Sequence, residues 1–124
     1  MPGAKTFEEL DCWRLSCQLK GALLSISRRP AVRPDSQFIG QLRNAARSAP
    51  SNIAEGFGRR THADFARFLD IARGSLRECE NLLKDALDEG YITTVEYEAL
   101  RILAKRAGGA TLALERYLRN TRDR

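Results

Sequence analysis

Hydrophobic residues recur at three- and four-residue steps along almost the whole chain, which is the spacing of amphipathic helices. Four segments carry this pattern, and each is bounded by proline, glycine or a capping residue. We predict helices over roughly residues 10–29, 36–57, 62–89 and 94–120. Because the connections between them are short, consecutive helices should run antiparallel. The expected fold class is therefore all-α, an antiparallel up-down-up-down four-helix bundle in which residues 1–124 form a single domain.

The second of these segments has the cleanest apolar stripe and also contains a proline. Pro50 lacks a backbone N–H and its ring clashes with the carbonyl of Ala46, so we expect a kink at Pro50 and not a helix end. Gly56 and Gly58 should end this helix, because glycine adopts the left-handed cap conformation freely. The apolar stripe consists of Phe38, Ile39, Leu42, Ala45, Ala46, Ala49, Ile53, Ala54 and Phe57.

Two of the predicted helix starts have capping sequences. Thr61 and Thr93 each precede an acidic residue by three positions, which is the spacing of a capping box. In the fourth segment the pair Gly108-Gly109 interrupts the apolar stripe. Such a pair either bends the helix or lets a neighbouring helix approach closely, and the sequence leaves both interpretations open.

The composition excludes several classes of protein. The 124 residues are 43% hydrophobic and 30% charged, as in ordinary globular domains. No apolar stretch approaches the ~18–20 residues of a membrane span, and the first residues lack the apolar segment of a secretory signal. We therefore expect a cytoplasmic protein with no membrane partner. The three cysteines are an odd number, which favours free thiols, and we expect Cys79 in the core.

The sequence contains no evident residue set for catalysis or metal binding. There is one histidine, His62, which we expect to be exposed near a helix start. The chain has no Ser-His-acid set, no HExxH and no Glu-x-x-His pair. Gly56-x-Gly58 follows a predicted helix and not a strand, so it is not a dinucleotide-binding loop. We expect a protein that is not an enzyme and that needs no cofactor or metal.

Charge is distributed unevenly along the chain, whose net charge is +5. Residues 28–60 hold seven arginines and two acids, for a net charge of +5. Residues 78–98 hold one lysine and seven acids (−6), and residues 116–124 hold four arginines and one acid (+3). Seventeen of the 21 basic residues are arginine, whose planar guanidinium suits phosphate. A GC-rich genome gives the same bias, so the sequence leaves both explanations open.

The predicted topology brings two basic regions to one end of the bundle. The turn after the second helix and the end of the fourth helix both lie at the end where the chain begins. Arg43 and Arg47 lie one turn apart on the second helix, opposite its apolar stripe. The alternative interpretation of these charges is a solvated rim. The candidate phosphate contacts are Arg43, Arg47, Arg59, Arg60, Arg116 and Arg119.

Two motifs resemble those of a known protein family. Residues 51–59, SNIAEGFGR, are followed by residues 65–76, FARFLDIARGSL. Together they resemble the four-helix-bundle proteins encoded within bacterial 23S rRNA intervening sequences, sometimes labelled ribosomal S23 proteins. The accessory variability proteins of diversity-generating retroelements are related to these. The resemblance covers roughly residues 7–120, with departures at Asn44, where a second arginine is common, and at residues 78–81.

The resemblance implies a non-enzymatic helical bundle that is frequently assembled as a homopentameric ring. For the retroelement relatives it implies a positively charged surface that engages nucleic acid and a reverse transcriptase. The charge pattern supports self-association independently. The acidic region 78–98 of one copy can meet basic regions of another head-to-tail, and contacts of that kind close into rings.

The residues of the two motifs have a structural interpretation. Glu55 is one acid in a strongly basic stretch, so we expect it to pair with Arg59 or Arg73 and fix the corner between the second and third helices. Small residues on these helices should let them pack closely. The residues given a structural role are Asn52, Glu55, Gly56, Gly58, Arg73 and Gly74.

Two functions are consistent with the sequence. The first is an oligomeric, non-enzymatic bundle that binds RNA or DNA through arginine-rich surfaces with little sequence specificity. The second is a protein-interaction scaffold with no nucleic-acid role. A net charge of +5 is modest for a nucleic-acid binder, and the acidic region would repel phosphate.

Overall fold

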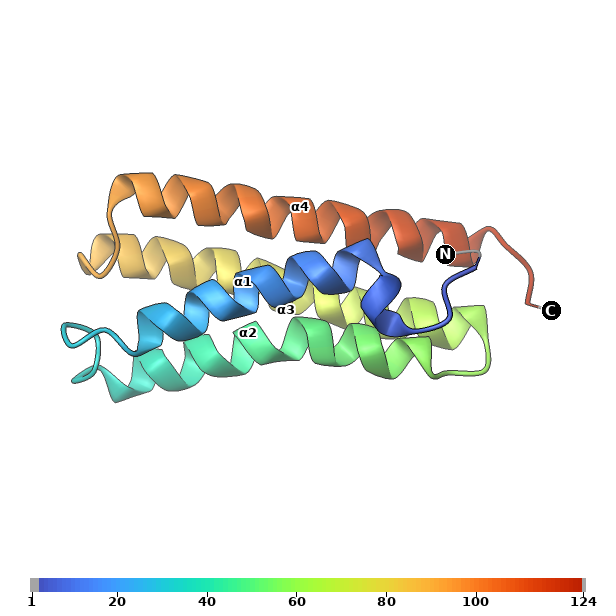
Figure 1. Ribbon diagram of the computed structural model, residues 1–124, viewed down its shortest axis with the longest axis horizontal. Helices are drawn as coiled ribbons and strands as arrows, with labels where there is room; N and C mark the ends of the chain where they lie inside the picture. Colours follow the sequence, from blue (N-terminus) through green and yellow to red (C-terminus); the bar gives the residue numbers. More distant parts are fainter. Residues whose placement is uncertain (1–2, 124) are drawn as a thin grey trace.

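The computed structural model describes residues 3–123, and these form an all-α four-helix bundle with no strand among them. This confirms the predicted fold class. Consecutive helices alternate in direction along the long axis of the molecule (Figure 1). A single 3-10 turn, η1, precedes the bundle. The elements are η1 (Phe7–Glu9), α1 (Asp11–Ser27), α2 (Ser36–Phe57), α3 (His62–Asp88) and α4 (Thr94–Arg119).

Each helix packs against two neighbours. Helix α2 contacts α1 and α3, and α4 contacts α3 and α1, so that α2 and α4 lie diagonally across the bundle. The α1–α2 and α3–α4 turns lie together at one end, which we call the turn end. The α2–α3 turn and both chain termini lie at the other, which we call the terminal end (Figure 1). These positions decide which charged side chains can meet.

The helices begin where the sequence supplies capping side chains. The Asp35 carboxylate accepts a hydrogen bond from the backbone N–H of Phe38 at 3.1 Å. The Thr61 hydroxyl caps α3 in the same way. At α4, Thr93 and Glu96 form a complete capping box, which confirms the prediction for that start. Helix α2 continues through Pro50 to Phe57, and the kink expected at Pro50 stays a prediction.

The hydrophobic core consists of two clusters, one toward each end of the bundle. The turn-end cluster includes Leu19, Leu23, Leu42, Leu76 and Leu83. The terminal-end cluster has the following residues at its centre: Leu10, Ile53, Phe65, Leu69 and Leu118. Cys79 is buried in the turn-end cluster, which confirms its expected place in the core.

Small and polar side chains occupy the level between the two clusters. The Ser48 and Ser75 hydroxyls are 2.7 Å apart and join α2 to α3. The Asn52 amide donates to the Ser48 carbonyl at 2.8 Å. The Thr111 hydroxyl donates to the carbonyl of Ala107. Of these hydrogen bonds, the Ser48–Ser75 bond joins two helices, whereas the other two satisfy polar side chains within α2 and α4.

An ion pair joins the two turns at the turn end. The Arg29 guanidinium binds the carboxylate of Glu96 and donates to the carbonyl of Tyr91 at 2.9 Å. The Tyr91 hydroxyl in turn donates to Asp35 at 2.7 Å, and this bond raises the pKa of Tyr91 to about 12. The hydrogen bonds from Arg29 lower the pKa of Glu96 to about 2. The pair thus ties the end of α1 to the start of α4.

We predict that this ion pair loses its contribution to stability in acid. The pKa of Glu96 is depressed in the folded state, so the contribution is complete above pH 4.5 and disappears as the pH falls toward 2. Glu96→Gln keeps a capping-box acceptor but removes the charge. It should lower the free energy of unfolding by about 1 kcal/mol near pH 7, a modest value because the pair is half-exposed. Near pH 3 the loss should be smaller, because part of the ion pair's contribution has already disappeared there.

Urea unfolding at the two pH values measures the difference. Glu98→Gln is the matched control, because Glu98 makes only an exposed pair with Arg101 one turn away. An equal effect of Glu96→Gln at both pH values would contradict the prediction.

Candidate nucleic-acid interface

The two halves of the bundle differ in their charge balance. Between Cys12 and Ala54, which covers α1 after its first residue, Asp11, and α2 up to Glu55, the chain has seven basic residues and one acid, for a net charge of +6. The acid is Asp35, whose carboxylate is occupied by the α2 cap and by the Tyr91 hydroxyl. Almost all the carboxylates that could neutralise these cations lie elsewhere in the chain.

On α3 and α4, by contrast, many basic side chains are paired with carboxylates. Glu115 is buried between two arginines, with Arg73 at 3.2 Å and Arg119 at 3.3 Å. Lys105 of α4 reaches Glu80 of α3 at 3.0 Å. Further pairs lie within single helices, Lys84–Asp88 and Arg101–Glu98. Charge on this half is therefore largely compensated.

Five of the seven basic side chains on the α1–α2 half have no such partner. Arg14 is held by backbone carbonyls of η1 and by Asp11, and Arg29 is held by Glu96. The others make no ion pair within 4 Å and no side-chain hydrogen bond to any residue between 3 and 123. These five, which we call the cation row, are Lys20, Arg28, Arg33, Arg43 and Arg47.

Helical geometry places three members of the row over the seam between α1 and α2. Asn52 and Ser48 face α3, because Ser48 bonds to Ser75. Arg43 is nine residues, or two and a half turns, before Asn52, so it lies on the opposite flank of α2 and faces α1. Arg47 follows one turn later on the same flank.

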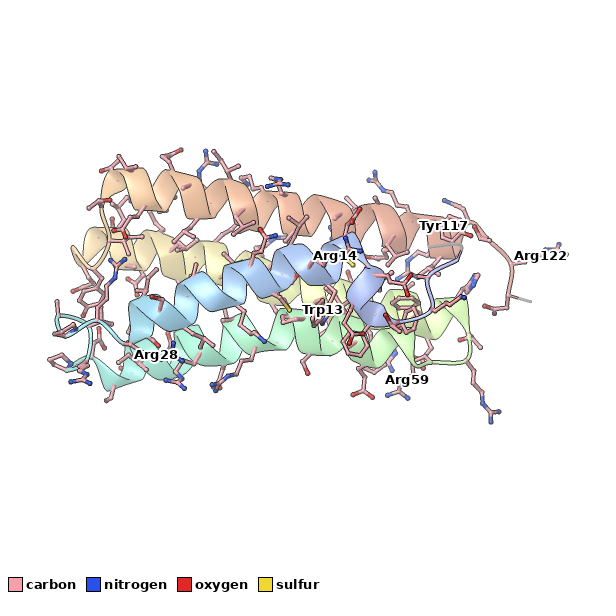
Figure 2. All side chains as sticks on the ribbon, viewed as in Figure 1. Trp13, Arg14, Arg28, Arg59, Tyr117 and Arg122 are labelled. Atoms are coloured by element: carbon pink, nitrogen blue, oxygen red, sulfur yellow. The ribbon has the colours of Figure 1, made fainter. Side chains whose placement is uncertain are left out.

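The same reasoning places Lys20 on the facing flank of α1. Asp11 lines a groove shared with α4, and Lys20 follows it by nine residues, so Lys20 lies on the α2 side of α1. The remaining two members, Arg28 and Arg33, are exposed at the turn end. Figure 2 shows Arg28 beside the α1–α2 turn. The row thus extends from the turn end along the seam.

The basic end predicted from the sequence is only partly available. Arg59 is 2.9 Å from Glu55 and 3.8 Å from Asp64, and its guanidinium stacks on Phe68. Arg119 is engaged by Glu115. Arg60 and Arg116 are exposed, and neither has a carboxylate within 4 Å among the residues described. Figure 2 shows Arg59 and Arg122 at the terminal end, far from Arg28.

The cation row was only half predicted from the sequence. Arg43 and Arg47 were expected because they lie opposite the apolar stripe. Lys20, Arg28 and Arg33 were not among the candidate contacts. The signal that could have found them is the absence of any acid between Asp11 and Asp35, a stretch that spans the whole of α1 and the following turn.

The motif residues form the corner between α2 and α3. The Glu55–Arg59 pair confirms one of the two predicted partners, whereas Arg73 pairs with Glu115 and with Asp70. Gly56 allows α3 to approach, because a Cβ there would lie 2.8 Å from atoms of both Phe65 and Phe68. Its predicted role as a helix end was wrong: Gly56 lies within α2 and is buried.

Four other glycines also test the sequence-based expectations. Gly58 follows the end of α2 with φ −82°, so the left-handed cap predicted there is wrong. A Cβ on Gly74, Gly108 or Gly109 would have no neighbour within 4 Å. Close packing therefore explains none of these three positions, and for the pair Gly108-Gly109 only the bend remains as a prediction.

The described residues contain no candidate metal site. No group of three or more His, Cys, Asp or Glu side chains that could hold a metal occurs between residues 3 and 123. His62 is half-buried, which corrects the expected exposure, because its ring lies 2.8 Å from the Thr121 carbonyl. No helix in this part of the chain is long and apolar enough to cross a membrane.

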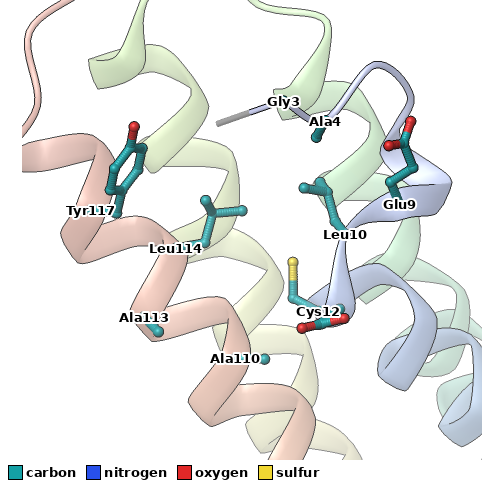
Figure 3. Close-up of a pocket in the computed structure, with 10 residues that line it drawn as sticks. Gly3, Ala4, Glu9, Leu10, Cys12, Ala110, Ala113, Leu114 and Tyr117 are labelled. Carbon is teal, nitrogen blue, oxygen red and sulfur yellow. The ribbon is translucent and has the colours of Figure 1, made fainter. Parts of the chain in front are cut away.

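A groove lies between the N-terminal segment and α4 (Figure 3). Its lining includes Leu10, Leu114 and Tyr117, together with Glu9 and Asp11. Cys12 also lines it, but burial raises the pKa of this thiol to about 11, so it is protonated near neutral pH. The groove thus has no activated nucleophile.

Comparison with known families settles the relationship suggested by the motifs. The family model for the 23S rRNA-intervening sequence protein matches residues 8–110. The chain belongs to this family. The match covers α1, α2, α3 and the first part of α4. All five members of the cation row lie within it. A comparison with curated proteins found no match to the chain.

We predict that Gly56 is the glycine of α2, α3 and α4 that tolerates substitution least. Gly56→Ala should lower the free energy of unfolding by about 1–3 kcal/mol, because the new methyl group meets the fixed Cβ of Phe68. Gly108→Ala is the matched control and should raise it by up to about 1 kcal/mol, since alanine favours the helix and the site is open. Chemical denaturation measures the free energy of unfolding of both variants. An equal change in the two would contradict the prediction.

Proposed function

We propose that this protein binds the phosphate backbone of nucleic acid through the cation row and that it is not an enzyme. The observation that carries the proposal is the set of five basic side chains without carboxylate partners between Cys12 and Ala54, a stretch whose single acid, Asp35, is already occupied. An arginine held by a carboxylate must give up that pair before it can bind phosphate. Members of the row have no such pair to give up.

The expected binding is electrostatic and weakly sequence-specific. Guanidinium groups bind phosphate oxygens through a planar fork, and each contact releases a condensed counterion. The affinity should therefore fall steeply with salt. Each phosphate contacted makes the slope of log K against log salt more negative by about 0.9. Arg60 and Arg116 at the terminal end are secondary contacts in this proposal. Arg59 and Arg119 contribute less, because carboxylates hold them.

The family description supports RNA as one ligand, since its name refers to 23S rRNA. A protein that meets ribosomal RNA or its precursors acts in the cytoplasm, and we propose that location. If the chain is encoded in a retroelement, a reverse transcriptase is a further proposed partner.

We also propose that copies of the chain associate, in line with the ring of five that the resemblance implies. Helix α4 supports this, because its outward side exposes Val95 (80%) and Ile102 (52%) where a solvated helix carries polar residues. Glu78 and Asp85 of α3 make no ion pair within residues 3–123, and they offer the basic side chains of a second copy a complementary charge.

The α4 surface is also the observation that favours the alternative function, a protein-interaction scaffold with no nucleic-acid role. The two functions differ in a simple property. A scaffold needs no affinity for nucleic acid, whereas the proposed function requires an affinity that added salt abolishes.

We predict that Arg43→Gln/Arg47→Gln weakens nucleic-acid binding and that Arg77→Gln/Arg106→Gln does not. Both double variants lose two positive charges from exposed or half-exposed positions that make no ion pair within the described residues, so net charge is matched. The first pair should lower the affinity by about tenfold and reduce the salt slope by about 2. Fluorescence anisotropy over a range of salt concentrations measures both quantities.

Three results would count against the proposal in different ways. Equal weakening by the two double variants would show that binding follows net charge and not the seam. A wild-type protein without salt-sensitive binding would favour the scaffold function. Light scattering on the same samples that returned the mass of a single chain would contradict self-association.

A further inference from the structure

We infer that the ligand of the cation row is double-stranded nucleic acid, recognised through the phosphates of both strands. This inference rests on the proposed function and makes its ligand specific. The features that carry it are the positions of the aromatic side chains, the length of the row and the density of charge that the row meets.

All nine aromatic side chains of the chain lie in the part that the structure describes, and eight are engaged within the bundle. Phe68 is covered by Arg59 and Arg67, whose guanidinium groups lie 4.5 and 4.6 Å from the ring centre. Tyr97 packs against the turn-end core. The other six form three ring pairs, namely Phe7–Trp13, Phe38–Tyr91 and Phe57–Phe65.

Tyr117, the ninth, is exposed on α4. Helix α4 lies diagonally across the bundle from α2, so Tyr117 is remote from Arg43 and Arg47. Figure 2 shows it at the terminal end, away from Arg28.

The two rings nearest the row are half-exposed and already paired. Trp13, on the flank of α1 that carries Lys20, packs edge-on against Phe7. Tyr91 at the turn end packs against Phe38. Among residues 3–123, no fully exposed and unpaired aromatic ring therefore lies beside the cation row.

The absence of such a ring disfavours single strands. Proteins that bind single-stranded nucleic acid stack its bases on aromatic side chains, and each stacked base contributes about 1–3 kcal/mol. Along this seam a single strand gains only phosphate contacts. A duplex presents one charge per ~1.7 Å of its axis, against ~3.4 Å for one strand, so the same cations meet twice the charge density.

The length of the row also fits a duplex. Arg33 lies in the turn just before α2, and Arg47 is eleven residues beyond the start of α2, which is about 17 Å at a rise of 1.5 Å per residue. The grooves of B-form DNA are about 12 and 6 Å wide. A rigid row of this length can therefore contact phosphates on both strands across one groove.

The test compares four probes of the same sequence and a length of about 24 nucleotides: duplex RNA, duplex DNA and one single strand of each. Binding to the wild-type protein is followed by anisotropy at about 50 mM salt, where phosphate contacts are strong. The emission of Trp13, the single tryptophan, is recorded in parallel, because a base that stacks on it would quench it.

We expect at least one duplex to bind about fivefold or more tightly than its own single strand, with Trp13 emission unquenched. Preference for duplex RNA or for duplex DNA supports the inference and identifies the source of the phosphates. Arg43→Gln/Arg47→Gln should remove most of the duplex preference, and Arg77→Gln/Arg106→Gln should keep it.

Single strands that bound as tightly as both duplexes, or that quenched Trp13, would overturn the inference and leave the proposed function standing. Failure of all four probes to bind would contradict the proposed function itself. The two failures are therefore distinguishable in one experiment.

Discussion

A carboxylate neutralises only the basic side chains that it can reach, and the fold decides which ones those are. Six of the sixteen acids lie on α3 and three on α4, and most of these nine pair with basic side chains outside the cation row. Between Cys12 and Ala54 the chain has a single acid, Asp35 in the α1–α2 turn, and its carboxylate is occupied by the α2 cap and the Tyr91 hydroxyl. The charge of the cation row follows from this division. Its availability to a ligand follows as well.

Architecture was largely predictable from the sequence because the helical signals are local. The apolar stripes and the capping residues Asp35, Thr61 and Thr93 each act within one or two turns of their own helix. Contacts between helices were not predictable in the same way. Whether Gly56 is needed for packing depends on Phe68 of the next helix. The pairing of Arg73 with Glu115 joins residues 42 positions apart.

The candidate site was predictable to a lesser degree, for the same physical reason. A sequence can show that Arg43 and Arg47 lie opposite an apolar stripe. It cannot show that Arg119 is held by a buried carboxylate or that Arg59 stacks on Phe68, because both depend on how α3 and α4 pack. The sequence therefore gives six equivalent candidates, and the structure separates paired arginines from unpaired ones.

The most direct test of this account observes the arginine side chains themselves. In nitrogen-15-labelled protein, the Nε–H resonances of arginine report on each guanidinium during titration with a short duplex. We expect those of Arg43 and Arg47 to shift at the lowest duplex concentrations, while those of Arg73 and Arg119 stay unchanged because Glu115 holds both. Shifts confined to the arginines of α3 and α4 would contradict the claim that the division of carboxylates between the two halves creates the binding surface.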